Sequence, residues 1–415
     1  MKRTLGTTAL GLACGMALLA PTAQAVEFAG MDFYGYLRGG YYESASSVPK
    51  GGYSLGGDAQ KFRLGNEGDQ GLEFGIGKSF TTDNGHKWGV RYMATVWDGN
   101  RGTAEAYATA SGFDFAPGAE FWAGQRRLRL QDVHIVDRFF ADYGDNYGAG
   151  FTGWKLGPVK LGVSLFSSGS VDDDKGRANN ARRLNVDVSG IPTNPGGSLR
   201  VTGTLVKGDF LYGRDGVGLS LVHNQEDFLM PGMKNSLFLQ AASGHAGLNG
   251  QFANLGGHGR RGLSRGENGE NDMPGITGRR IVDSLQWQHG RLGGQALVSY
   301  QTGKLDGGPN NGRSTKDFSL GGRMAYDFTN NFKLLVEAGT TSRRVEGQAT
   351  QRLNKFTIAP ALALAPGFWS RPEVRLYATR VTWNDAAAAA NASGFAARGR
   401  KAATLFGVQL ETWWD

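Results

Sequence analysis

The sequence predicts an all-β fold, a large antiparallel β-barrel that spans a membrane. Three observations carry this prediction. Segments of about ten residues alternate apolar and polar side chains, as strands between lipid and water do. Beyond residue 25 there is no run of 18 apolar residues, so no membrane-spanning helix is expected. The 415 residues include 66 glycines but only 12 prolines, which favours a large β protein over a disordered chain.

The first residues form a predicted export signal. Lys2 and Arg3 precede an apolar run of small residues, and Ala-Gln-Ala at 23–25 is typical of a cleavage site. We expect a signal peptide at 1–25 and the barrel at 26–415. A lipoprotein signal ending at Cys14 is the alternative. Since Cys14 is the only cysteine, the exported barrel is expected to contain no disulfide.

The net charge does not indicate a nucleic-acid partner. The formal charge of +8 falls to +6 (8 − 2) once Lys2 and Arg3 are removed with the signal. The arginine-rich stretch at 260–265 is rich in glycine and lacks interleaved aromatic side chains, so we expect no nucleic acid to bind. The six histidines show no metal-ligand spacing, and we expect no cofactor and no metal.

Residues 32–41 show how the strands are recognised. Phe33 and Leu37 fall on one face of this segment, whereas Tyr36 and Arg38 fall on the other. We therefore expect the first face to meet lipid and the second to meet water inside the barrel. Further segments with this alternation are expected at 72–80, 86–97, 159–166, 180–191, 198–207, 216–224, 236–242, 280–288, 292–301, 317–328, 331–341, 354–363, 370–383 and 404–414.

The connections between these segments are of two kinds. Tight turns are expected at 157–158, 289–290 and 329–330, and long Gly, Asn and Ser stretches at 243–278 and 384–401. Short turns at one end and long loops at the other are typical of outer-membrane barrels. With weak strands counted, sixteen to eighteen strands are expected, roughly the number at which a barrel holds a water channel. A soluble propeller or β-helix is the alternative, but no fixed repeat supports it.

Residues 121–140 carry an unusual number of charges between aromatic ends, Arg127, Asp132 and Arg138 among them. Such a segment cannot face lipid, and in a soluble core each charge would need a partner. We interpret it as exposed to water inside a pore. Asp132 and His134 lie there without a serine, so hydrolytic chemistry is not indicated, and we expect no enzyme activity.

The chain resembles the maltoporin-type sugar porins of bacterial outer membranes. The resemblance rests on the motifs DFYGYLR at 32–38, FRLGNE at 62–67, WAG at 122–124 and WSRP at 369–372, and on the closing Trp413 and Trp414. It implies an eighteen-stranded barrel, usually a homotrimer, in a Gram-negative outer membrane, in contact with lipid and lipopolysaccharide. It also implies an inward-folded constriction loop, near 122–140, and a path of aromatic rings along which sugars pass.

The resemblance assigns aromatic side chains to that path. Tyr36, Trp369 and Trp413 match its members, and alternation independently turns all three away from the lipid face. Trp97 lies near the place where the family presents a tryptophan from the neighbouring subunit. Phe139 falls on a further aromatic position of the family, whereas Gly71 stands where a tyrosine of the path is expected.

The resemblance also assigns ionic side chains to the pore lining. Leu130 replaces a family arginine, and the neighbouring Arg129 is a substitute for it. The expected lining residues are Arg38, Arg63, Glu73, Arg129, Asp132 and Asp137. Such groups suit sugars, because rings stack on the apolar faces of a pyranose while arginines and carboxylates bond its hydroxyls.

The sequence therefore predicts a passive outer-membrane channel for sugars or oligosaccharides. A general or anion-preferring porin on the same barrel is the alternative, because 121–140 is rich in arginine and Gly71 interrupts the aromatic path. A structural barrel with a plugged interior is a third hypothesis.

Overall fold

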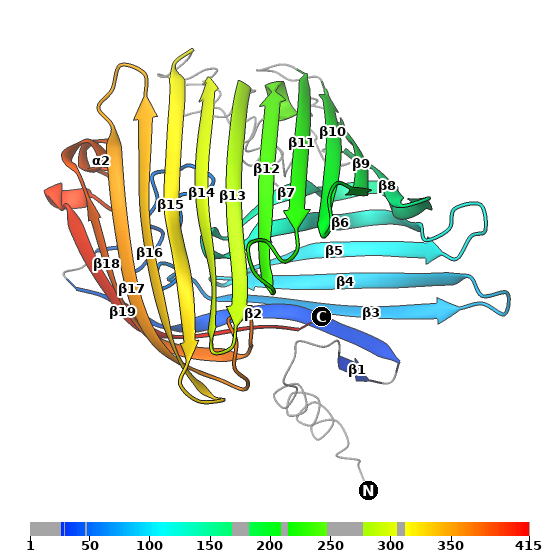
Figure 1. The fold of residues 1–415 in the computed structure, drawn as a ribbon, viewed down its shortest axis with the longest axis horizontal. Helices are drawn as coiled ribbons and strands as arrows, with labels where there is room; N and C mark the ends of the chain where they lie inside the picture. The colour runs from blue at the N-terminus through cyan, green and yellow to red at the C-terminus, as the bar shows by residue number, and fades with distance from the viewer. Residues whose placement is uncertain are drawn as a thin grey trace, which may run out of the picture.

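The computed structural model describes residues 26–28, 30–45, 48–167, 182–208, 215–246, 277–304 and 312–414. The predicted signal peptide and residues 247–276 of the expected long loop lie outside these ranges. In the described chain, one antiparallel sheet contains every strand. The short β1 pairs with the start of β2. Strands β2–β19 close into a ring of eighteen through the β19–β2 and β9–β10 pairings (Figure 1).

The strands run along the chain in ring order. The first nine are β1 Val26–Phe28, β2 Met31–Ser44, β3 Gly71–Thr81, β4 Lys87–Trp97, β5 Asn100–Ser111, β6 Glu120–Val133, β7 Arg138–Leu156, β8 Val159–Ser167 and β9 Arg182–Pro192. The others are β10 Gly197–Lys207, β11 Gly216–Gln225, β12 Met233–Ser243, β13 Thr277–His289, β14 Leu292–Lys304, β15 Ser314–Asp327, β16 Phe332–Val345, β17 Gln351–Ala363, β18 Glu373–Trp383 and β19 Ala402–Trp414. The helices are short: η1 His134–Val136, η2 Gly244–Ala246, α2 Asp385–Ala390 and η3 Ala397–Gly399.

The wall of the barrel reverses the polarity of a soluble protein. In β18, Glu373 and Arg375 point inward and are 1% exposed, whereas Val374 and Leu376 point outward and are 41% and 58% exposed. Apolar side chains outside and ionic side chains inside are what a strand between lipid and water requires. Among the described residues, no helix has the length and apolar character needed to cross a bilayer.

Aromatic side chains gather at the end of the barrel where the turns are short. Phe80 and Trp88 stack at 4.2 Å across the turn that joins β3 to β4. Tyr326 and Phe328 contact each other at 5.0 Å beside the turn that joins β15 to β16. Rings at the level of lipid headgroups form the girdle of a membrane barrel.

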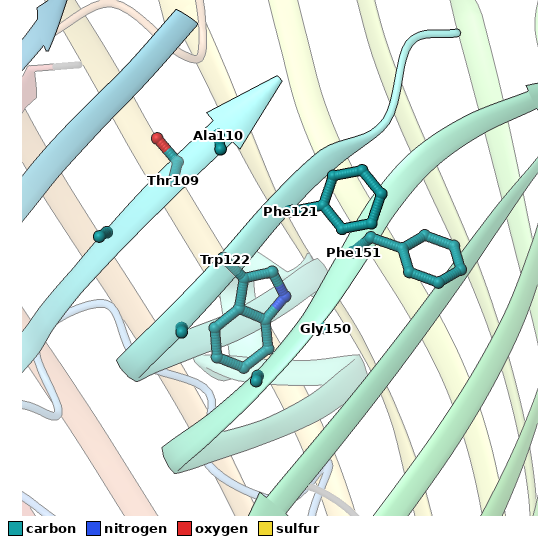
Figure 2. Close-up of a pocket in the computed structure, with 9 residues that line it drawn as sticks. Thr109, Ala110, Phe121, Trp122, Gly150 and Phe151 are labelled. Atoms are coloured by element: carbon teal, nitrogen blue, oxygen red, sulfur yellow. The ribbon is translucent and has the colours of Figure 1, made fainter. Parts of the chain in front are cut away.

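A shallow groove of about 470 Å³ lies on the outward face of β5, β6 and β7. Its floor includes the exposed side chains of Ala108, Ala123 and Ala149. Figure 2 shows Phe121 of β6 and Phe151 of β7 side by side at its edge, with ring centroids 5.6 Å apart. The groove therefore belongs to the lipid-facing surface and not to the interior.

The described residues of the loop 45–70, which joins β2 to β3, fold into the barrel. The Asn66 side chain holds this loop together by bonding both the N–H and the C=O of Tyr53 at 2.9 Å. The Phe62 ring lies flat against Gly321 of β15 and Gly339 of β16, where a Cβ on either glycine would collide with it. Leu64 N–H donates to Glu337 of β16 at 2.9 Å. The loop is thus fixed to the inner face of the wall at β15 and β16.

The charged segment 121–140 is only partly an inward loop, which corrects the expectation from the sequence. Most of it belongs to β6 and β7, and the part that turns inside the barrel is the tip formed by η1 and Asp137. The arginines of the segment and Asp137 are tolerated because each forms an ion pair with a nearby residue. The tip 134–137 and the loop 45–70 both narrow the interior, and they meet where the backbone N–H of Arg63 donates to Ile135 C=O at 3.0 Å.

Candidate functional site

Four aromatic side chains lie in succession inside the barrel. Trp97 at the end of β4 stacks on Tyr36 of β2, with centroids 6.2 Å apart and planes 20° apart. Tyr36 is the direct cross-strand partner of Trp413 on β19. Trp413 and Trp369 both contact the ring of His134, at 5.6 and 5.2 Å. The run leads from the long-loop end of the barrel to the short-turn end.

Trp369 lies in a turn and not in a strand as the alternation suggested. The turn at 364–372 folds back into the barrel because Phe368 N–H donates to Gln288 at 3.0 Å and Lys333 donates to Gly367 C=O at 2.9 Å. Phe368 is consequently buried, and its ring packs edge-on against Trp369 at 4.9 Å. Trp369 itself stays 40% exposed, so its surface is open to a solute.

Trp97 fills the place that Gly71 leaves open. The two residues are direct partners in the β3–β4 pairing. A Cβ built on Gly71 would collide with three atoms of the six-membered ring of Trp97, so the indole occupies the space that a side chain at 71 would need. Arg38 lies over the same ring at 5.2 Å. An aromatic surface is therefore present at this level of the barrel, supplied across the strand pair.

His134 joins the inward tip to the aromatic run. Arg63 Nη1 lies 3.2 Å from His134 Nδ1, and since arginine only donates, Nδ1 accepts and the proton sits on Nε2. In the described structure, the buried Nε2 has no hydrogen-bond partner. Burial, reinforced by the Arg63 guanidinium, holds the pKa of His134 well below its usual range. The imidazole is neutral and offers one N–H beside two tryptophans.

A network of buried ions surrounds Tyr36. Arg38 bonds Glu67 at 2.8 Å and Asp69 at 2.7 Å. Arg63 bonds Glu67 at 3.0 Å and Glu411 at 2.7 Å. Tyr36 Oη donates to Glu411 at 2.8 Å and accepts from Arg63 at 2.9 Å. The expected lining residues Arg38 and Arg63 thus stand beside the aromatic run, each with its charge compensated.

A second group of ions continues toward the short-turn end. Arg375 bonds Glu373 at 3.1 Å and Glu411 at 2.9 Å. Arg371 bonds Glu411 at 3.4 Å and lies over the Trp413 ring at 4.3 Å. Burying ions costs desolvation free energy, which is offset only where each charge has a well-placed partner, and here each has one.

The arginines of the β6–β7 hairpin are also paired. Arg127 bonds Glu73 at 2.7 Å, and Arg129 bonds Asp145 at 2.8 Å. The other two pairs are Arg126 with Glu120 at 2.9 Å and Arg138 with Asp58 at 2.9 Å. The positive charge that motivated an anion-preferring channel is therefore neutralised within the chain.

Asp132, Asp137 and Phe139 lie on the hairpin. Lys61 bonds Asp137 at 3.1 Å. Burial would raise the pKa of Asp137, but Arg63 and Lys61 outweigh it and hold that pKa well below its usual range. Asp132 on β6 is the cross-strand partner of Phe139 on β7, whose ring packs under the Arg129 guanidinium at 5.5 Å. The contacts of Phe139 are thus with the hairpin.

Sequence reasoning left Glu411 and Glu67 out of the candidate site. Glu411 is completely buried and meets Tyr36, Arg63 and Arg375. The alternation of β19 that turns Trp413 inward also turns Glu411 inward, so this residue could have been found. Glu67 lies in a loop without periodicity, and no pattern in the sequence predicts its ion-pair partners.

The family comparison covers nearly the whole chain. The family model described as LamB porin matches residues 31–414. A maltoporin of Vibrio cholerae is 28% identical over 433 aligned residues, which span 96% of this chain and 98% of that protein. A maltoporin of a second strain of that species is also 28% identical, over 96% of this chain and 97% of the relative.

Solved structures share the fold at low identity. OccK10 (OpdN) of Pseudomonas aeruginosa has a TM-score of 0.52 and 11% identity, with 92% of this chain and 98% of that chain covered. OccK3 (OpdO) of the same species has a TM-score of 0.51 and 12% identity, with 92% and 95% covered. Together with the reversed polarity of the wall, these findings place the chain in the Gram-negative outer membrane as a porin channel. The chain belongs to the LamB porin family.

Proposed function

We propose that this porin passes sugars by passive diffusion along the rings of Trp97, Tyr36, Trp413 and Trp369. The succession of these rings is the observation that carries the proposal. Aromatic faces bind the apolar C–H faces of a pyranose, and the surrounding arginines and carboxylates bond its hydroxyls. Several weak sites in a row let a solute advance without being trapped.

Sugar block of the ionic current in planar bilayers tests this proposal. Trp369→Ala removes one ring and should weaken binding of a linear glucose trisaccharide by about 2- to 13-fold, since such a contact contributes roughly 0.5–1.5 kcal/mol. Tyr300→Leu, which alters an outward-facing ring, is the control and should leave the block unchanged. Equal block in Trp369→Ala and wild type would contradict the role of the rings.

Tyr36 needs two variants, because its hydroxyl also bonds Glu411. Tyr36→Phe keeps the ring and should retain the block, whereas Tyr36→Ala should weaken it. If Tyr36→Phe loses as much block as Tyr36→Ala, the ion network and not the ring controls binding.

An anion-preferring channel is the second candidate, and the arginines that motivated it are paired with carboxylates. We therefore expect weak ion selectivity. Reversal potentials in a salt gradient measure it, and strong anion preference without sugar block would favour the second candidate.

We also infer a homotrimer from membership of the family. Native mass spectrometry of detergent-purified protein tests this, with three chains per complex as the expected mass.

A further inference from the structure

A second cavity lies next to the aromatic run, at the long-loop end of the barrel. Its volume is about 330 Å³, and ionisable side chains line it: Lys50, Lys61, Glu67, Asp69 and Asp98. The first four belong to the inward loop 45–70, and Asp98 belongs to the turn between β4 and β5. The cavity is at the small end of the size range of ligand pockets, which fits one sugar ring better than a chain.

The frame of this cavity is fixed before any ligand arrives. Gly52 N–H donates to Asn66 C=O at 2.8 Å, which joins its two loop segments. Asp98 and Gln70 are joined twice, by Asp98 N–H to Gln70 C=O at 2.9 Å and by Gln70 N–H to Asp98 Oδ1 at 2.8 Å. A frame held in this way loses little conformational freedom on binding, which favours affinity.

The mixed charges around the cavity disfavour both anionic and cationic ligands. Glu67 and Asp69 are bonded to Arg38, and Lys61 is bonded to Glu67. Lys50 is half exposed, and its ammonium makes a long contact of 3.7 Å with the Glu43 carboxylate. This ammonium can therefore still donate hydrogen bonds to a ligand. Carboxylates repel an anion and ammonium groups repel a cation, whereas hydroxyl groups can accept from lysine and donate to aspartate. The chemistry of the lining matches a neutral polyol.

The cavity borders the first ring of the aromatic run. Arg38 bonds Asp69 at the cavity wall and lies over the Trp97 ring at 5.2 Å, and Asp98 directly follows Trp97. We propose that this cavity is a mouth subsite that binds one sugar ring before the sugar reaches Trp97. The proposal rests on the proposed function, since it assigns the first step to the same transport.

Two substitutions, made separately and together, test the subsite in planar bilayers. Lys50→Ala removes the exposed ammonium, and Asp98→Asn keeps the Oδ1 acceptor that Gln70 uses. With the glucose trisaccharide added on the long-loop side, the combined variant should lower the association rate about 3- to 10-fold. Added on the short-turn side, the same sugar should associate at the wild-type rate. Lys401→Ala removes an exposed lysine from another loop at the same end and is the matched control.

The outcomes separate the two proposals. A wild-type channel that no sugar blocks would overturn the proposed function. A wild-type channel that is blocked, with the combined variant and Lys401→Ala both associating at the wild-type rate, would overturn the subsite alone. A changed reversal potential in Lys50→Ala with an unchanged association rate would show an ion filter and would also overturn it.

Discussion

The Glu411 carboxylate binds four donor side chains in the interior of the barrel. Tyr36, Arg63, Arg375 and Arg371 all bond its carboxylate, at 2.8, 2.7, 2.9 and 3.4 Å. Without this charge, three guanidinium groups would lose a counter-ion in a site from which water is excluded. Removing one partner from a buried ion pair costs more than the pair itself contributes.

Glu411→Gln should therefore lower the free energy of unfolding by about 3–5 kcal/mol. Chemical denaturation of the barrel in detergent micelles or lipid vesicles measures the change. Glu226→Gln is the control, because its pair with Lys234 is more than half exposed on both sides and is expected to contribute about 0–1 kcal/mol. Equal effects of the two substitutions would contradict the structural role of Glu411.

Trp97 and Gly71 share one place in the structure, and this makes a rescue experiment possible. Trp97→Ala should weaken sugar block about 2- to 13-fold, because it removes one ring. Gly71→Tyr on its own should disturb the fold, since its Cβ meets the Trp97 ring. The combination Gly71→Tyr with Trp97→Ala returns a ring to the same level and should restore the block. Failure of the combination in a correctly folded barrel would show that Trp97 acts in another way.

At the scale of elements, the loop 45–70 depends on two glycines in distant strands. Gly339→Ala places a methyl group where the Phe62 ring lies and should cost about 1–3 kcal/mol through overpacking. We expect faster proteolysis within 48–67, measured by mass spectrometry of the cleavage products. Gly203→Ala on β10 is the matched control, since a Cβ there meets nothing within 4 Å. A similar effect of both variants would contradict the role of the contact between Phe62 and Gly339.

The inward tip 134–137 is expected to respond to acid through His134. Arg63, Arg371 and Arg323 face its imidazole, opposed by Glu411, and burial with Arg63 lowers its pKa. When the tip is released, the pKa of its histidine is about 6.5. Docking of the tip is therefore fully favoured above that pH and weakens as the pH falls below it. Channel current noise should rise between about pH 6.5 and 5.

His134→Asn is the control for this pH effect, because its amide oxygen can still accept from Arg63 and does not titrate. The variant should lose the rise in current noise. A rise of the same size in His134→Asn would assign the effect to other groups.

At the scale of the whole molecule, the outward face should behave as a surface in lipid. Leu320 lies at the middle of β15 and is 50% exposed. Leu320→Arg should destabilise the barrel in vesicles by about 2–4 kcal/mol, the cost of a cation at the midplane. Leu229, 81% exposed in the turn between β11 and β12, should accept arginine without loss. A soluble barrel would tolerate both.

The sequence predicts the strands of the barrel wall better than the segments that fold into the barrel interior. Alternation alone turns Tyr36 and Trp413 inward, because a strand between lipid and water must sort its side chains. It fails in the region of β6, where Gly124 has a φ of 130° and register shifts interrupt the β6–β7 pairing. Alternation also cannot predict the contacts of Phe62, since the glycines that contact its ring lie more than 250 positions away along the chain.

The attachment of the inward loop also limits when that loop can dock during folding. Residues 45–70 are made early in synthesis, yet Phe62 docks between β15 and β16 and Leu64 also bonds Thr357 of β17. This loop has no completed binding surface until the C-terminal third of the chain is in place. We therefore expect this loop to take its final position, and the pore its final width, only after β15, β16 and β17 have joined the ring.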